Sequence, residues 1–114
     1  MTESEHSIQV SLVTELAYRL RPEIVRYAIP NGGLRNIRVA QKLKAEGLQP
    51  GMPDLGFAIE DGRCRWLEMK TDKGALSVYQ IGIRRRLERL GHEWAMARSV
   101  DEALSHLADW GLLK

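Results

Sequence analysis

The sequence GMPDLGFAIEDGRCRWLEMK, residues 51–70, holds two short apolar segments separated by the dipeptide Asp61-Gly62. Asp-Gly accepts positive φ at both positions, which a tight type I′ hairpin turn requires. The pattern therefore predicts antiparallel strands over residues 55–60 and 63–70. It also brings the two ends of the stretch, which carry the ionisable side chains, to the open end of one hairpin.

The side chains at that open end can share one face. Successive side chains of a strand point to opposite faces, so Glu68 and Lys70 lie on one face and Leu67 and Met69 on the other. Counting back from the turn places position 54 near position 69, to within about one residue of register. We therefore expect Asp54, Glu68 and Lys70 to meet.

Two carboxylates held close together repel unless a proton or a cation lies between them, and oxygen ligands favour hard ions such as Mg²⁺ or Mn²⁺. Magnesium usually takes one or two protein carboxylates, which leaves positions for a phosphate oxygen and an attacking water. The amine of Lys70 can orient that water and offset charge in the transition state. The constellation predicts Asp54 and Glu68 as metal ligands and Lys70 as a catalytic residue. Taken singly, Glu-x-Lys is a common solvated strand pair, and Asp54 can be a turn residue after Pro53.

The rest of the chain divides into helices and short strands. Apolar residues at helical spacing predict helices over residues 6–20, 36–46, 77–90 and 100–109, and Ser99 with Glu102 matches a capping box before the last. Strands are expected over residues 24–29 and 93–97. A strand, a helix and a further strand in sequence favour a right-handed parallel crossover. The order α-β-α-β-β-α-β-α predicts an α/β fold with a small mixed β-sheet flanked by helices.

Length and composition indicate one soluble globular domain over residues 1–114. The 114 residues are 44% hydrophobic and 28% charged, and no apolar run approaches the length that spans a bilayer. The N-terminus lacks a basic start followed by an apolar segment, so we expect an intracellular protein with no membrane partner. The single cysteine, Cys64, excludes an internal disulfide and is expected to be a packed side chain.

The net charge of +2 is only mildly basic, but the cations are clustered. Arg35, Arg38 and Lys42 recur at three- and four-residue spacing, which aligns them on one helical face. A second cluster comprises Arg84, Arg85, Arg86 and Arg89. One such cluster is usually a solvated helix surface; two favour sequence-independent contacts with the phosphates of a nucleic acid.

Several of these motifs resemble those of the VRR-Nuc branch of the PD-(D/E)xK nucleases. The matching segments are Ile29-Pro-Asn-Gly-Gly, the Glu-Gly-x-x-Pro-Gly run of residues 46–51, Gly51-Met-Pro-Asp54, Glu68-Met-Lys70 and Leu76-Ser-x-x-Gln80. The resemblance covers most of the chain and implies a restriction-endonuclease-like core. It implies that Asp54 and Glu68 bind Mg²⁺ or Mn²⁺, that the Met69 backbone carbonyl is a further ligand, and that Lys70 serves the hydrolytic water.

The resemblance also implicates two residues on helices. Similar nucleases carry a glutamate on the first helix near the metal; Glu5 matches best, as a catalytic and metal-binding residue, and Glu15 is the competitor. Gln80 corresponds to a catalytic glutamine on the helix after the lysine strand, although Arg84 stands where an aromatic partner is expected. Each residue also has a non-catalytic interpretation. Glu5 can be an exposed acid at a helix start, where the helix dipole favours it, and Gln80 can be a polar residue at a helix start.

A loop and its neighbouring arginine complete the expected site. Asn31-Gly32-Gly33 is a turn signal, since Asn and Gly tolerate positive φ. By resemblance, this loop edges the active site. Arg35 adjoins it and is the cation for which we most expect a DNA contact.

Together, the residues and the resemblance predict a Mg²⁺-dependent endonuclease that hydrolyses DNA phosphodiester bonds. The resemblance implies a role in replication, repair or recombination, extending to branched DNA such as a Holliday junction, in the cytoplasm of a bacterium or of a phage-infected host. A domain this small has few residues left to grasp a junction, so we expect a homodimer. The alternatives are a non-catalytic nucleic-acid-binding module and a purely structural partner; the complete Asp-Glu-Lys set favours an enzyme.

Overall fold

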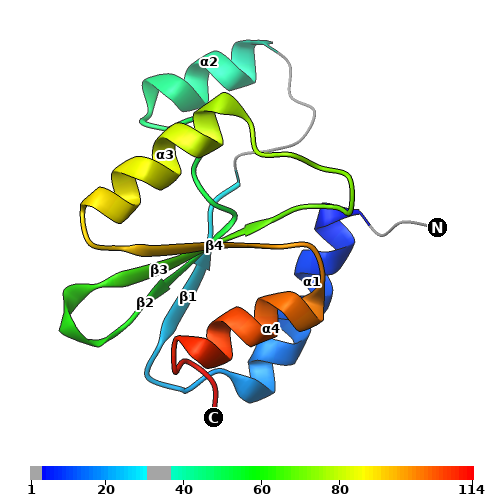
Figure 1. The fold of residues 1–114 in the computed structure, drawn as a ribbon. Helices are drawn as coiled ribbons and strands as arrows, with labels where there is room; N and C mark the ends of the chain where they lie inside the picture. Colours follow the sequence, from blue (N-terminus) through cyan, green and yellow to red (C-terminus); the bar gives the residue numbers. More distant parts are fainter. Residues whose placement is uncertain (1–3, 31–36) are drawn as a thin grey trace.

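The computed structural model describes residues 4–30 and 37–114 and contains a four-stranded sheet between helices (Figure 1). The elements are α1 (Glu5–Arg19), β1 (Val25–Ala28), α2 (Ile37–Ala45), β2 (Leu55–Ala58), the 3₁₀ turn η1 (Glu60–Gly62), β3 (Cys64–Met69), α3 (Val78–Arg89), β4 (Glu93–Ala97) and α4 (Val100–Asp109). The predicted order of helices and strands is confirmed, and element ends agree with the prediction to within two residues. No helix in the described ranges is long and apolar enough to cross a membrane.

The strands lie in the order β1-β2-β3-β4. The β1–β2 and β2–β3 pairs are antiparallel, and β3–β4 is parallel. Helix α3 makes the crossover from β3 to β4, as a strand-helix-strand unit requires when its strands are parallel. The predicted mixed sheet flanked by helices is therefore confirmed, and β3 lies inside it with a partner on each side.

The apolar core lies on the face of the sheet covered by α1 and α4, while α3 covers the other face (Figure 1). Helix α1 contributes Ile8, Leu12 and Leu16, spaced four residues apart so that they share one side of the helix. They pack with fully buried strand residues such as Phe57 and Leu67. Leu67 and Met69 point into this apolar face, so Glu68, which lies between them on β3, projects to the α3 side.

On the face of the sheet covered by α3, aromatic side chains pack against one another and against Arg84. Trp66 and Trp94 are buried, and the guanidinium of Arg84 lies 4.6 Å from the centre of the Trp94 ring. Tyr27 meets Trp66 edge to face, with ring centroids 5.7 Å apart. It crosses above Gly56, its partner on β2, where a Cβ atom would lie only 2.4 Å from the Tyr27 ring.

The hairpin loop between β2 and β3 is one residue longer than predicted. Asp61 and Gly62 have φ angles of 70° and 69°, as an Asp-Gly turn requires, but Glu60 also belongs to the loop. The Ile59 N–H donates to the Arg63 carbonyl at 3.1 Å and closes it. The loop therefore spans three residues rather than two.

This longer loop shifts the strand pairing by one residue. Leu55 pairs with Leu67, so continuing the register places Asp54 opposite Glu68 rather than near position 69. The physical reason is that Glu60 belongs to the 3₁₀ turn rather than to the ladder, and its carboxylate accepts a hydrogen bond from Arg21 Nη2 at 2.5 Å. The shift brings the two acids on one face closer together than the prediction did.

Candidate active site

A cavity of about 220 Å³ lies at the open end of the hairpin. Its lining includes Glu5 at the start of α1, Asp54 just before β2, Glu68 near the end of β3 and Gln80 in the first turn of α3. Four of the residues singled out from the sequence thus come from four separate parts of the chain to one cavity.

Asp54 is anchored on both sides. Its Oδ2 atom accepts a hydrogen bond from the Met69 N–H at 2.7 Å, and its carbonyl accepts one from the Ile29 N–H at 2.9 Å. Pro53, the preceding residue, is fully buried. Asp54 therefore ties the start of β2 to the end of β3, and its carboxylate faces that of Glu68.

Glu68 is a buried acid, 2% exposed. Its Oε2 atom accepts a hydrogen bond from Gln80 Nε2 at 2.9 Å, whereas Oε1 is buried and accepts no hydrogen bond from a donor group in the described part of the chain. Burial, the charge of Asp54 and a hydrogen bond shared with Asp54 raise the pKa of Glu68 to about 9, against a smaller lowering by Lys70. The pair thus favours a proton or a cation at this position.

Lys70 follows β3 on the same face as Glu68 and is 9% exposed. Its backbone N–H donates to the Ala97 carbonyl at 2.9 Å, which fixes the chain beside β4. Its amine is close enough to Glu68 to lower the pKa of that carboxyl, although Lys70 does not line the cavity itself. The structure brings Asp54, Glu68 and Lys70 together, as the alternation along β3 predicts.

Gln80 has two simultaneous roles. Its Oε1 atom accepts from the Ser77 N–H at 2.8 Å, while Ser77 Oγ accepts from the Gln80 N–H at 3.1 Å. These two bonds form a capping box at the start of α3. The remaining amide group donates to Glu68, so both interpretations of Gln80, a helix-start residue and a site residue, describe one side chain.

Of the two candidate acids on the first helix, only Glu5 reaches the cavity. Glu5 lines it and its charge contributes to the raised pKa of Glu68. Glu15 lies on an exposed part of α1, with a carboxylate oxygen 3.8 Å from the guanidinium of Arg19. The geometry therefore separates two residues that the sequence left as competitors.

Sequence reasoning missed Arg98, which holds the loop after Lys70. Arg98 Nη1 donates to the carbonyls of Thr71 and Gly74 at 2.6 and 2.7 Å, and to that of Asp72 at 3.1 Å. The pairing of Met69 with Ala97 puts position 98 beside this loop. Only the parallel register of β3 and β4 could have revealed the contact, because nothing in the local sequence around position 98 indicates it.

The carboxylates of the cavity suit a hard cation that takes only a few of its ligands from the protein. Among residues 4–30 and 37–114, no three His, Cys, Asp or Glu side chains are grouped as a ready-made metal site. Asp54 and Glu68 offer two carboxylates, and Glu68 keeps one buried oxygen without a partner. Mg²⁺ commonly binds through one or two carboxylates and retains waters, so the pair fits such an ion.

The basic residues fall into two groups. Arg38 and Lys42 on α2 and Arg85 on α3 are exposed. Arg84 lies against Trp94 and pairs with Glu88 at 3.3 Å, which gives it a packing contact that the sequence did not indicate. Arg35 and the Asn31-Gly32-Gly33 loop fall outside the described residues.

A comparison with solved structures finds a similar architecture. A "VRR_NUC domain protein" superposes with a TM-score of 0.75 over 95% of this chain and 88% of that chain, at 19% sequence identity. The chain has the VRR_NUC fold. This confirms, at the level of the fold, the resemblance seen in the sequence and the restriction-endonuclease-like architecture it implied. No protein-family profile and no curated protein matches the sequence. Within this VRR_NUC fold, the candidate site lies where β2 begins and β3 ends.

Proposed function

We propose that the protein is a metal-dependent endonuclease that hydrolyses DNA phosphodiester bonds. The observation that carries the proposal is the buried Glu68 carboxylate, which faces Asp54 and retains an oxygen without a partner among the described residues. Burying a carboxylate beside another carboxylate is unfavourable unless a proton or a cation compensates. The VRR_NUC fold supports the same conclusion.

Each site residue has a distinct role in this proposal. Asp54 and Glu68 hold Mg²⁺ or Mn²⁺, with the Met69 carbonyl as a further ligand and Glu5 as an additional acid of the cavity. The bound ion supplies Lewis-acid polarisation of the phosphate and acidifies a water. The Lys70 amine orients the attacking water and offsets negative charge that grows on the phosphate oxygens. Gln80 fixes the orientation of the Glu68 carboxylate through its 2.9 Å hydrogen bond.

Exposed cations on α2 and on α3 provide the DNA contacts of the proposal. Arg38, Lys42 and Arg85 are free of ion pairs within the part of the chain that the structure describes. Arg35 and Arg84 complete the proposed set, with Arg84 also held against Trp94. Such contacts bind phosphates of any sequence, so affinity falls steeply with salt.

The proposed substrate extends to branched DNA, and the proposed assembly is a homodimer. Two copies present two sites, which allows symmetric incision of both strands at a junction. The proposed setting is replication, repair or recombination in the cytoplasm of a bacterium or of a phage-infected host.

The test is cleavage of a supercoiled plasmid and of a four-way junction with and without Mg²⁺ or Mn²⁺. We expect the native protein to cut only with metal and Lys70→Ala to bind the junction without cutting it. Lys114→Ala, which removes an exposed lysine at the C-terminus, is the matched control and should cut normally. A native protein that binds the junction yet cuts with neither metal would be a non-catalytic binding module, and the proposal would be wrong.

A further inference from the structure

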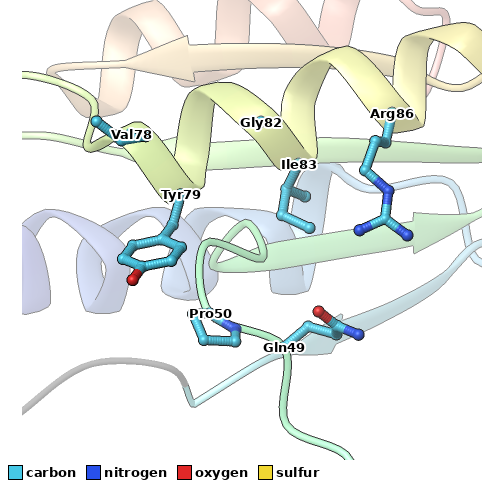
Figure 2. A pocket seen from close by; sticks show the side chains of 7 residues that line it. All are labelled: Gln49, Pro50, Val78, Tyr79, Gly82, Ile83 and Arg86. Carbon is cyan, nitrogen blue, oxygen red and sulfur yellow. The ribbon is translucent and has the colours of Figure 1, made fainter.

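A second cavity, of about 300 Å³, lies between α3 and the segment of Gln49 and Pro50 (Figure 2). Tyr79, Ile83 and Arg86 project from α3 toward that segment (Figure 2). Their spacing of four and three residues puts them on one side of the helix. The roles proposed above use none of these three side chains.

The second cavity adjoins the acidic one. Pro50 and Tyr79 line both. Between them, Gly51 has a φ of +91° and passes so close to α3 that a Cβ atom would lie 2.5 Å from the Tyr79 carbonyl carbon. The chain at Gly51 therefore separates two adjoining cavities, and this adjacency is what neighbouring nucleotides of one strand would require.

The lining suits a nucleotide that is not base-paired. Tyr79 is 67% exposed and presents an aromatic ring, while Pro50 and the buried Ile83 add apolar surface. Arg86 is exposed and has no ion pair among the described residues, so its guanidinium is available for a phosphate. Aromatic stacking with a base and a cation for the backbone are the two elements by which proteins hold single-stranded nucleic acid. A base inside a duplex is already stacked and paired, so it cannot enter.

We propose that this cavity binds one unpaired nucleotide of the cleaved strand, with its base stacked on Tyr79 and a phosphate at Arg86. The inference rests on the proposed function and narrows its substrate class. The preferred DNA carries an unpaired nucleotide next to the scissile phosphodiester, as at a branch point or a bulge, and fully paired duplex is the poorer substrate.

Gly82 offers a way to close the cavity without disturbing the fold. It lines the cavity, and a Cβ atom built on it would meet no other atom within 4 Å. Leucine also has a higher helix propensity than glycine, so Gly82→Leu fills the space and favours α3. Ala108→Leu, on the exposed side of α4, is the matched control for adding a leucine to a helix surface.

Tyr79 is tested by a second, independent pair of variants. Tyr79→Ala removes the ring and Tyr79→Phe keeps it, so the phenylalanine variant should restore what the alanine variant loses. Tyr18→Ala removes a tyrosine of similar exposure, 76%, from α1 and serves as the matched control.

The experiment compares two DNA duplexes that differ only in whether one central 2-aminopurine is unpaired or paired. Binding is measured in the Lys70→Ala background, where 2-aminopurine fluorescence reports stacking and titration gives the affinity; cleavage is measured with the catalytic lysine present. We expect quenching only for the unpaired base, and a preference for the unpaired duplex in both binding and cleavage. Tyr79→Ala and Gly82→Leu should each reduce that preference by about 10-fold, or about 1.4 kcal/mol.

The outcomes distinguish the inference from the proposed function. If the native protein cuts both duplexes equally with metal and the Lys70→Ala protein shows no binding preference and no quenching, the inference is wrong and the nuclease proposal stands. If the Lys70→Ala protein shows the preference and the quenching but the native protein cuts neither duplex, the cavity is supported and the nuclease proposal fails. A change of oligomeric mass in Gly82→Leu by light scattering would identify the cavity as a contact between copies and overturn the inference.

Discussion

Gln80 Nε2 donates a hydrogen bond to Glu68 Oε2 at 2.9 Å while Gln80 Oε1 accepts one from the Ser77 N–H at 2.8 Å. One amide group thus joins the first turn of α3 to the buried acid of β3. Because both ends of the amide are engaged, the Glu68 carboxylate has a fixed orientation before any ligand arrives.

Replacing Gln80 by alanine removes both bonds, so we expect a 10- to 100-fold loss of cleavage rate or of metal affinity and a loss of about 1 kcal/mol in the free energy of unfolding. Ser77→Ala is the matched control, because it removes only the cap. It should lose a similar amount of stability and retain most of the activity. Metal-dependent cleavage rates and chemical denaturation measure the two effects. Equal losses of activity in the two variants would assign the effect to the helix cap.

Glu68 is expected to destabilise the metal-free protein, because its second oxygen is buried without a partner and Asp54 faces it. Glu68→Gln keeps the shape and an oxygen that can accept from Gln80, but carries no charge. We expect it to raise the free energy of unfolding by about 1–2 kcal/mol in chelator at mildly alkaline pH while abolishing cleavage. Glu15→Gln, an exposed glutamate on α1, should change stability little. A destabilised Glu68→Gln protein would contradict this account.

The stability of the metal-free protein should depend on pH in a defined direction. The pKa of Glu68 is about 9 in the folded state against an ordinary 4.5, so between these values the folded state binds more protons than the unfolded state. Stability from this group is therefore lost as the pH rises from about 4.5 to about 9. A cation replaces the proton, so the rise in Tm on adding Mg²⁺ should grow across the same window. Thermal unfolding in chelator and in Mg²⁺ measures both trends, and a Mg²⁺ effect that shrinks toward alkaline pH would refute the assignment.

Arg98 is expected to act by positioning the loop that follows Lys70. Arg98→Ala removes its three hydrogen bonds to loop carbonyls. We expect the single-turnover cleavage rate to fall by about 10- to 100-fold, because small displacements of a catalytic group are costly. Affinity for DNA should stay within about 2-fold, because Arg98 is half-buried, donates to loop carbonyls and is not among the proposed DNA contacts. A loss of affinity without a loss of rate would make Arg98 a DNA contact instead.

Arg85 should contribute to affinity without contributing to sequence preference. It is exposed on α3 and has no ion pair among the described residues. Arg85→Ala should weaken binding to unrelated duplexes equally and reduce the slope of log K against log salt by about 1. Lys114→Ala, at the C-terminus, is the matched control and should leave the slope unchanged. An unchanged slope in Arg85→Ala would exclude a phosphate contact at this residue.

The sequence predicted the elements and the meeting of the three site residues because these depend on local chemistry. Apolar spacing defined the helices, and alternation along the β3 segment placed Glu68 and Lys70 on one face. Asp54 lies opposite Glu68, within the one-residue tolerance of the predicted register, but the three-residue loop was not predicted, because Glu60 joins the turn and contacts Arg21, a residue far away in sequence. No local pattern contains that information.

Two further features differ from what the sequence pattern indicated. The capping box predicted at Ser99 forms only its first bond, from the Glu102 N–H to Ser99 Oγ at 3.1 Å, whereas the complete box lies at Ser77 and Gln80. Arg84 appeared in the sequence as one of several cations, yet it packs on Trp94. The packing of Arg84 on Trp94 depends on the positions of α3 and β4 at once, whereas the two capping contacts each lie at the start of a single helix.

Strand β3 carries both Glu68 and the approach to Lys70, and it is held by β2 on one edge and by β4 on the other. A local fluctuation that detaches either neighbour leaves β3 bonded to the remaining one, so its amides should be among the slowest in the sheet to exchange with solvent. Segments at the edges of the fold can therefore fluctuate locally while Asp54 and Glu68 keep their spacing. The sheet thus keeps the spacing of the two acids independent of movements at the surface of the molecule.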